Sequence, residues 1–225
     1  MSAMLELKSA DGAAVPAYVA QPAGKPKGAV VVIQEIFGVN SHIRSVADGY
    51  AARGYLAVAP ALFARVKPGV ELGYSPDDIQ VGFALKSQME AMQVKALNDI
   101  QAAITYAARA GRVGIVGYCW GGLLAWRAAC ELHGLDAAVP YYGGGMTDEA
   151  DRKPACPVLC HFAEDDSYIP LPGVQALRAA HPDVQVHIYP AVHHGFNCDQ
   201  RGSYNEAAAK LARERSLAFF AKHLG

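Results

Sequence analysis

The stretch from Ile115 to Gly122 limits most strongly how this chain can fold. A short apolar run, Val113 to Val116, ends at Gly117, and Cys119 follows two residues later. The segment from Leu123 to Leu132 is rich in alanine and leucine and contains no glycine or proline, which predicts a helix. Glycines lie two residues before and after Cys119, where a strand and a helix would have to pass closely. The pattern therefore predicts a strand, a tight turn and a helix, with one reactive side chain at the turn.

Strand-like and helix-like segments alternate along the whole sequence. This alternation is typical of an α/β fold with a mostly parallel sheet, because each parallel crossover needs a connecting helix. No repeat, low-complexity segment or linker interrupts it, so we expect a single domain over residues 1–225. The expected strands cover residues 5–7, 15–20, 28–34, 55–59, 113–116, 137–141, 157–162 and 184–189, and the expected helices cover 41–53, 75–90, 94–109, 123–132, 172–180 and 203–222.

Three serines are candidates for the first residues of helices. Ser41 is expected to cap the first helix, and Ser75 precedes a proline and two aspartates that suit a first helical turn. Ser203 and Glu206 have the spacing of a capping box, which predicts that the last helix begins there.

The composition excludes several classes of protein. The 20 lysines and arginines nearly balance 21 acidic residues, and no basic patch is visible, so nucleic acid and anionic membranes are not expected partners. No run of about 18 apolar residues occurs, and the N-terminus has no apolar signal segment. The five cysteines are scattered and odd in number, which favours reduced thiols and a cytoplasmic location.

Polar side chains that could carry chemistry follow four of the expected strands. They are Glu35, Cys119, the pair Asp165 and Asp166, and the pair His193 and His194. Since the carboxyl ends of parallel strands meet at one edge of a sheet, we expect these groups to converge. Taken singly, each has an ordinary explanation, because an acidic pair often caps a turn and a loop histidine is often solvated. Together, in this order, they favour nucleophilic catalysis.

Four motifs resemble the dienelactone hydrolase family of α/β-hydrolases. They are QEIFGVN at 34–40, GYCWGG at 117–122, HFAEDDSYIP at 161–170 and HHGF at 193–196. The resemblance covers nearly the whole chain and implies an α/β-hydrolase fold. It identifies Cys119 as the nucleophile, Asp166 as the triad acid and His194 as the triad base. His193 is then expected to be an ordinary loop side chain.

The resemblance also implies a reaction that needs neither a metal nor a cofactor. Cys119 would attack an ester or lactone carbonyl, and the backbone N–H groups of Ile36 and Trp120 would bind the oxyanion. Glu35 would take part in activating the thiol. The alternative is that Glu35 only forms an ion pair with an arginine, such as Arg44 or Arg201.

The sequence departs from the family where the substrate carboxylate binds. Members use two arginines, but residues 77–83 contain none and Cys198 stands four residues after the expected base. Arg201 is a nearby replacement, and Phe37, Tyr142 and Phe196 are further expected substrate contacts.

The predicted function is therefore hydrolysis of a small ester or lactone, of the carboxymethylenebutenolidase type, by a monomer or small homo-oligomer. The alternatives are a carboxylesterase or thioesterase for a more apolar substrate, and a redox-sensing thiol protein built on the same scaffold.

Overall fold

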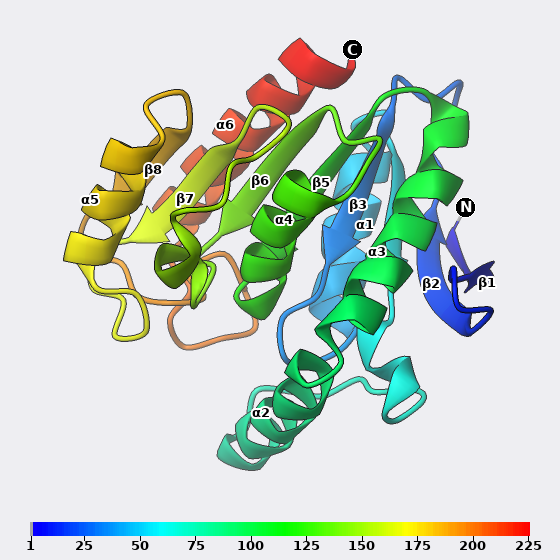
Figure 1. Ribbon diagram of the computed structural model, residues 1–225, viewed down its shortest axis with the longest axis horizontal. Helices are drawn as coiled ribbons and strands as arrows, with labels where there is room; N and C mark the ends of the chain where they lie inside the picture. The colour runs from blue at the N-terminus through cyan, green and yellow to red at the C-terminus, as the bar shows by residue number, and fades with distance from the viewer. Residues whose placement is uncertain (1) are drawn as a thin grey trace.

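The computed structural model describes residues 2–225, in which eight strands form one sheet (Figure 1). Their spatial order is β1-β2-β4-β3-β5-β6-β7-β8. The hairpin of β1 and β2 joins the sheet antiparallel to β4, and all later pairings are parallel, which confirms the expected mostly parallel α/β architecture. The strands are β1 (Ser2–Lys8), β2 (Ala14–Ala20), β3 (Ala29–Ile33), β4 (Leu56–Pro60), β5 (Val113–Tyr118), β6 (Ala137–Tyr141), β7 (Leu159–Ala163) and β8 (Gln185–Tyr189).

Helices cover both faces of the sheet. One layer holds α1 and α6, and the opposite layer holds α3 and α4 (Figure 1). The helix α2 instead lies beyond one end of the sheet, where its Gly82 packs against the carbonyl of Ile36. The α-helices are α1 (Ser41–Ala51), α2 (Pro76–Glu90), α3 (Gln93–Ala107), α4 (Trp120–Glu131), α5 (Leu171–Ala180) and α6 (Glu206–Leu224), and short 3₁₀ turns span Leu62–Arg65, Ala108–Ala110 and Met146–Glu149.

The central strands explain why the sheet is covered on both sides. Every residue of β3, β4, β5, β6 and β7 is buried. Parallel strands with helices on both faces read as continuous apolar runs, as the expected strand at 28–34 does. Among the helices in residues 2–225, none has the length and apolar character that crossing a bilayer requires.

Two of the three predicted helix starts were wrong. Asn40 caps α1 by accepting a hydrogen bond from the Ile43 N–H, so Ser41 is already helical. Asn205 caps α6 in the same way, and Ser203 lies outside the helix. In both cases an asparagine within two residues of the serine takes the position, because its side chain is at least as good a cap. The start at Ser75 is confirmed by a reciprocal capping box.

Candidate active site

The turn that carries Cys119 is as tight as the glycine spacing predicts. Cys119 has φ 57° and ψ −120°, a strained conformation for a residue with a side chain. A Cβ atom on Gly117 would lie 1.9 Å from the Gly121 carbonyl oxygen, and one on Gly121 would lie 2.4 Å from the Gln34 carbonyl oxygen. Only glycine fits at either position, because strand β5, helix α4 and the end of β3 meet there.

His194 and Asp166 form a buried hydrogen-bonded pair beside this turn. His194 Nδ1 lies 2.7 Å from Asp166 Oδ2, and Oδ1 accepts the Tyr168 backbone N–H at 2.9 Å. The aromatic rings of Tyr142 and Tyr168 contact the imidazole edge-on and hold its plane. Asp166 is therefore positioned to fix which ring nitrogen of His194 carries a proton.

The imidazole of His194 also lies near Cys119. Burial lowers the pKa of His194, but Cys119 and Asp166 outweigh burial and raise that pKa above its ordinary value. Cys119, His194 and Asp166 thus lie close together although they follow three different strands.

The neighbouring acid and histidine lie outside this cluster. Asp165 is exposed, and its backbone carbonyl lies 3.1 Å from Nδ1 of the exposed His193. Each of the two pairs in the sequence therefore has one buried member in the cluster and one member at the surface.

A cavity of about 80 Å³ opens onto Cys119 and His194. Ile36 and Trp120, the two expected oxyanion donors, both line it. Trp120 is the first residue of α4, so its N–H has no helical acceptor. Within residues 2–225, the Ile36 and Trp120 N–H groups donate to no other backbone or side-chain group. Both N–H groups are thus free for a ligand. The remaining lining residues are Phe37, Ile79, Phe83, Lys86, Gly144, Tyr168 and Arg201.

Two expected substrate contacts need correction. Tyr142 and Phe196 are fully buried and do not line the cavity. Their rings pack against each other, and the ring of Tyr142 also packs edge-on against the imidazole of His194. They belong to the core under the site because the chain turns inward after β6 and after His194. Phe37 and Arg201, the other two expected contacts, do line the cavity.

Glu35 forms the ion pair that the sequence left as an alternative. Its side chain is completely buried, and Arg201 Nη1 donates to Oε1 at 3.2 Å. The Tyr74 hydroxyl lies 3.4 Å from Oε2. Arg44, the other candidate partner, pairs instead with Glu71 at the surface. Glu35 therefore holds Arg201 in the wall of the cavity.

Comparison with known proteins agrees with this architecture. Residues 15–224 match the model of the dienelactone hydrolase family. The chain belongs to the dienelactone hydrolase family. It is 37% identical over 227 residues to a carboxymethylenebutenolidase of Pseudomonas putida, covering 96% of this chain and 95% of that one.

Solved structures place the family member in the α/β-hydrolase fold. The crystal structure of a protein from Klebsiella pneumoniae described as a dienelactone hydrolase superposes with a TM-score of 0.85. The two sequences are 35% identical, and the match covers 99% of this chain and 98% of the other. An esterase of Pyrococcus furiosus shares the fold at 14% identity, with a TM-score of 0.69 over 100% of this chain and 93% of its own. The expected α/β-hydrolase fold is confirmed.

Lys86 is a cavity residue that the sequence analysis missed in this dienelactone hydrolase family member. It lies on α2 with Ile79 and Phe83, and all three line the cavity. Their spacing of four and three residues puts them on one helix face, which was a signal in the sequence. The helix lacks the arginine expected for the family but presents a lysine one turn further along.

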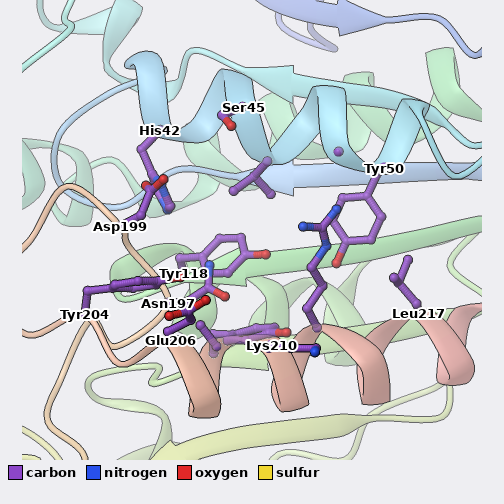
Figure 2. Close-up of a pocket in the computed structure, with 15 residues that line it drawn as sticks. His42, Ser45, Tyr50, Tyr118, Asn197, Asp199, Tyr204, Glu206, Lys210 and Leu217 are labelled. Carbon is purple, nitrogen blue, oxygen red and sulfur yellow. The ribbon is translucent and has the colours of Figure 1, made fainter.

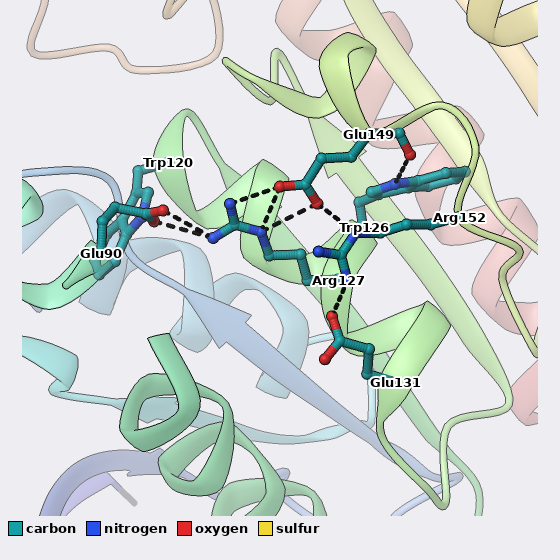
Figure 3. A network of polar contacts seen from close by, with 7 residues as sticks. All are labelled: Glu90, Trp120, Trp126, Arg127, Glu131, Glu149 and Arg152. Carbon is teal, nitrogen blue, oxygen red and sulfur yellow. Dashed lines mark hydrogen bonds and ion pairs between the residues drawn. The ribbon is translucent and has the colours of Figure 1, made fainter. Parts of the chain in front are cut away.

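A partly buried ion network ties α2 to α4, the helix that follows Cys119 (Figure 3). Arg127 of α4 pairs with Glu90 at the end of α2 at 2.9 Å and with Glu149 at 2.6 Å. The Trp120 indole N–H donates to Glu90 as well. Removing one member of such a pair leaves a charge without its partner, at a cost of about 3–5 kcal/mol when fully buried. The network therefore holds Trp120 in place and also α2, whose residues line the cavity.

Proposed function

We propose that this family member hydrolyses an ester or lactone through an acyl-enzyme on Cys119, with His194 as base and Asp166 as its orienting acid. Membership of the family makes the chain a hydrolase of carboxylic ester or lactone bonds. The finer mechanism is supported by one observation above all. Cys119 and His194, which are far apart in the sequence, line one cavity, where His194 is paired with Asp166 and two backbone N–H groups are free.

In the proposed first step, Cys119 attacks the substrate carbonyl as a thiolate. The raised pKa of His194 favours an imidazolium beside the thiolate, and the N-terminus of α4 adds positive potential at the sulfur. The carbonyl oxygen becomes an oxyanion held by the N–H groups of Ile36 and Trp120. As the tetrahedral intermediate collapses, the carbon–oxygen bond breaks and His194 gives its proton to the leaving alkoxide. A thioester on Cys119 remains.

The second step returns the enzyme to its resting state. His194 removes a proton from water, which attacks the thioester carbonyl. The carbon–sulfur bond breaks, the carboxylic acid leaves and Cys119 is again a thiolate beside protonated His194. Asp166 keeps the imidazole in one tautomer and orientation throughout. In this scheme Glu35 supports the site by holding Arg201 in place.

The lining of the cavity supports a substrate that is partly apolar and carries an anionic group. Ile79 and Phe83 provide an apolar wall, and Lys86 and Arg201 supply two cations. A cation next to a carboxylate forms a charge-assisted hydrogen bond, which suits a lactone with a free acid group. A neutral ester would use only the apolar wall.

Asp166→Asn tests the proposed triad. We expect kcat for p-nitrophenyl acetate to fall by about 10²–10⁴-fold, because asparagine can stabilise the wrong tautomer of His194. The matched control is Asp165→Asn, which changes the exposed neighbour and should leave kcat within about twofold, as surface substitutions usually do. Equal losses in both variants, or full activity in Asp166→Asn, would remove Asp166 from the mechanism.

A further inference from the structure

Three potential metal ligands meet in the interior of the protein. A carboxylate oxygen of Glu35, a ring nitrogen of His42 and the sulfur of Cys198 all lie within 4.8 Å of one another. All three side chains are buried. They come from the loop after β3, the first turn of α1 and the loop between β8 and α6. None of them is a member of the proposed triad.

The imidazole of His42 points to a ligand at this place. Its Nδ1 lies 3.2 Å from Asp199 Oδ1, so Nδ1–H can donate to that carboxylate. Its Nε2 is buried and has no hydrogen-bond partner among residues 2–225, in a side chain that is 96% buried. A neutral imidazole that donates through one nitrogen presents a lone pair on the other, and metal-binding histidines commonly donate to a carboxylate in this way.

The three donor atoms suit zinc. Thiolate, imidazole and carboxylate are its usual ligands, in tetrahedral geometry that places ligand atoms about 3.5 Å apart. The present separations are at most 4.8 Å, so binding would draw the three donor atoms closer together.

We propose that Glu35, His42 and Cys198 form a second site that binds Zn²⁺ or a similar thiophilic divalent cation. Binding forms one metal–sulfur, one metal–nitrogen and one metal–oxygen bond, and the Cys198 proton passes to solvent. Water fills the fourth position. This site could not be predicted from the sequence, because its ligands are scattered over more than 160 residues without zinc spacing.

One ligand of this site, His42, lines a cavity on the face of the molecule that carries α1 and α6. A cavity of about 310 Å³ lies between these helices, and His42 and Asp199 line it (Figure 2). Figure 2 shows the two side chains together at one end of the cavity. A hydrated cation would reach His42 from this cavity without passing the catalytic one.

Occupancy of the second site would inhibit hydrolysis, a consequence that rests on the proposed function. Glu35 pairs with Arg201, which lines the catalytic cavity. A divalent cation on Glu35 would take up its charge and repel the guanidinium of Arg201. Arg201 would then leave the position in which it meets the substrate.

Cobalt binding tests the site without using activity. The background is Cys119→Ala, because Cys119 and His194 could otherwise bind the metal themselves. In that background we expect one Co²⁺ per chain and sulfur-to-cobalt charge-transfer absorption, with Zn²⁺ displacing the cobalt. Adding Cys198→Ser should abolish the charge-transfer band, and adding His42→Gln should weaken binding at least about tenfold. Cys130→Ser, on another cysteine, should change neither.

A variant at the surface controls for the possibility that the buried variants, Cys198→Ser and His42→Gln, lose metal binding because they misfold. Asp199 is 62% exposed, so Asp199→Asn should fold normally and weaken metal binding about 10–100-fold by removing the partner of His42. Absence of the charge-transfer band in the Cys119→Ala background, or an unchanged band after Cys198→Ser, would overturn the proposal.

Inhibition is measured separately in the protein that retains Cys119. Zn²⁺ should inhibit ester hydrolysis, and Asp199→Asn should raise the half-inhibitory concentration at least about tenfold. An unchanged half-inhibitory concentration of Zn²⁺ in Asp199→Asn would show that the second site does not inhibit hydrolysis. It would not contradict metal binding at that site. A wild-type protein that hydrolyses no ester would contradict the proposed function and leave the cobalt result unaffected.

Discussion

Cys119→Ala is expected to lower kcat for p-nitrophenyl acetate by about 10⁴-fold or more, because it removes the atom that would form the thioester. The oxyanion donors and the pair of His194 and Asp166 remain, so only slow attack by water is left. The fold should persist, because Cys119 is partly exposed and alanine keeps the same Cβ atom. Steady-state kinetics measures the loss, and a thermal melt checks the fold.

The matched control for this prediction is Cys130→Ser, which changes a half-buried cysteine remote from the cavity lining. It should retain kcat within about twofold. If Cys119→Ala keeps more than about a tenth of the activity, the nucleophile lies elsewhere, since loss of a nucleophile costs far more than tenfold.

Gly117→Ala is expected to destabilise the protein by at least about 3 kcal/mol, the upper end of what overpacking usually costs. The added methyl group would lie 1.9 Å from the Gly121 carbonyl oxygen, which is backbone and cannot rotate away. Strand β5 and helix α4 would have to separate, and Cys119 would lose the conformation that presents its sulfur. Urea unfolding of the variant and the wild type measures the difference.

Gly24→Ala is the control for that substitution. Gly24 lies in the loop before β3, and a Cβ atom there would meet nothing within 4 Å. Its free energy of unfolding should stay within about 0.5 kcal/mol of the wild type. A Gly117→Ala variant as stable as Gly24→Ala would show that the turn is looser than the packing around it indicates.

The sequence predicted the fold and the central turn because both follow from local rules. Buried parallel strands give unbroken apolar runs, and the close approach at the turn demands glycine on both sides of Cys119. It could not assign helix caps where two suitable residues lie within two positions of each other, so Asn40 and Asn205 were missed in favour of serines.

The wall of the cavity depended on tertiary placement and was harder to predict. Tyr142 and Phe196 were expected at the substrate as aromatic residues of an apolar pocket, yet both are buried in the core. Lys86 enters the wall only because α2 packs across the end of the sheet, through the contact of Gly82 with Ile36. The pairing of Glu35 with Arg201 likewise depends on how the last loop folds back over β3.

Mass spectrometry of the enzyme quenched with acid during turnover of p-nitrophenyl acetate tests the proposed nucleophile most directly. The account predicts that the intact chain gains the mass of one acetyl group and that peptide mapping finds it on Cys119. The adduct should be absent from Cys119→Ala. An acetyl group on a different residue, or steady hydrolysis with an unmodified Cys119 at every quench time, would contradict the account.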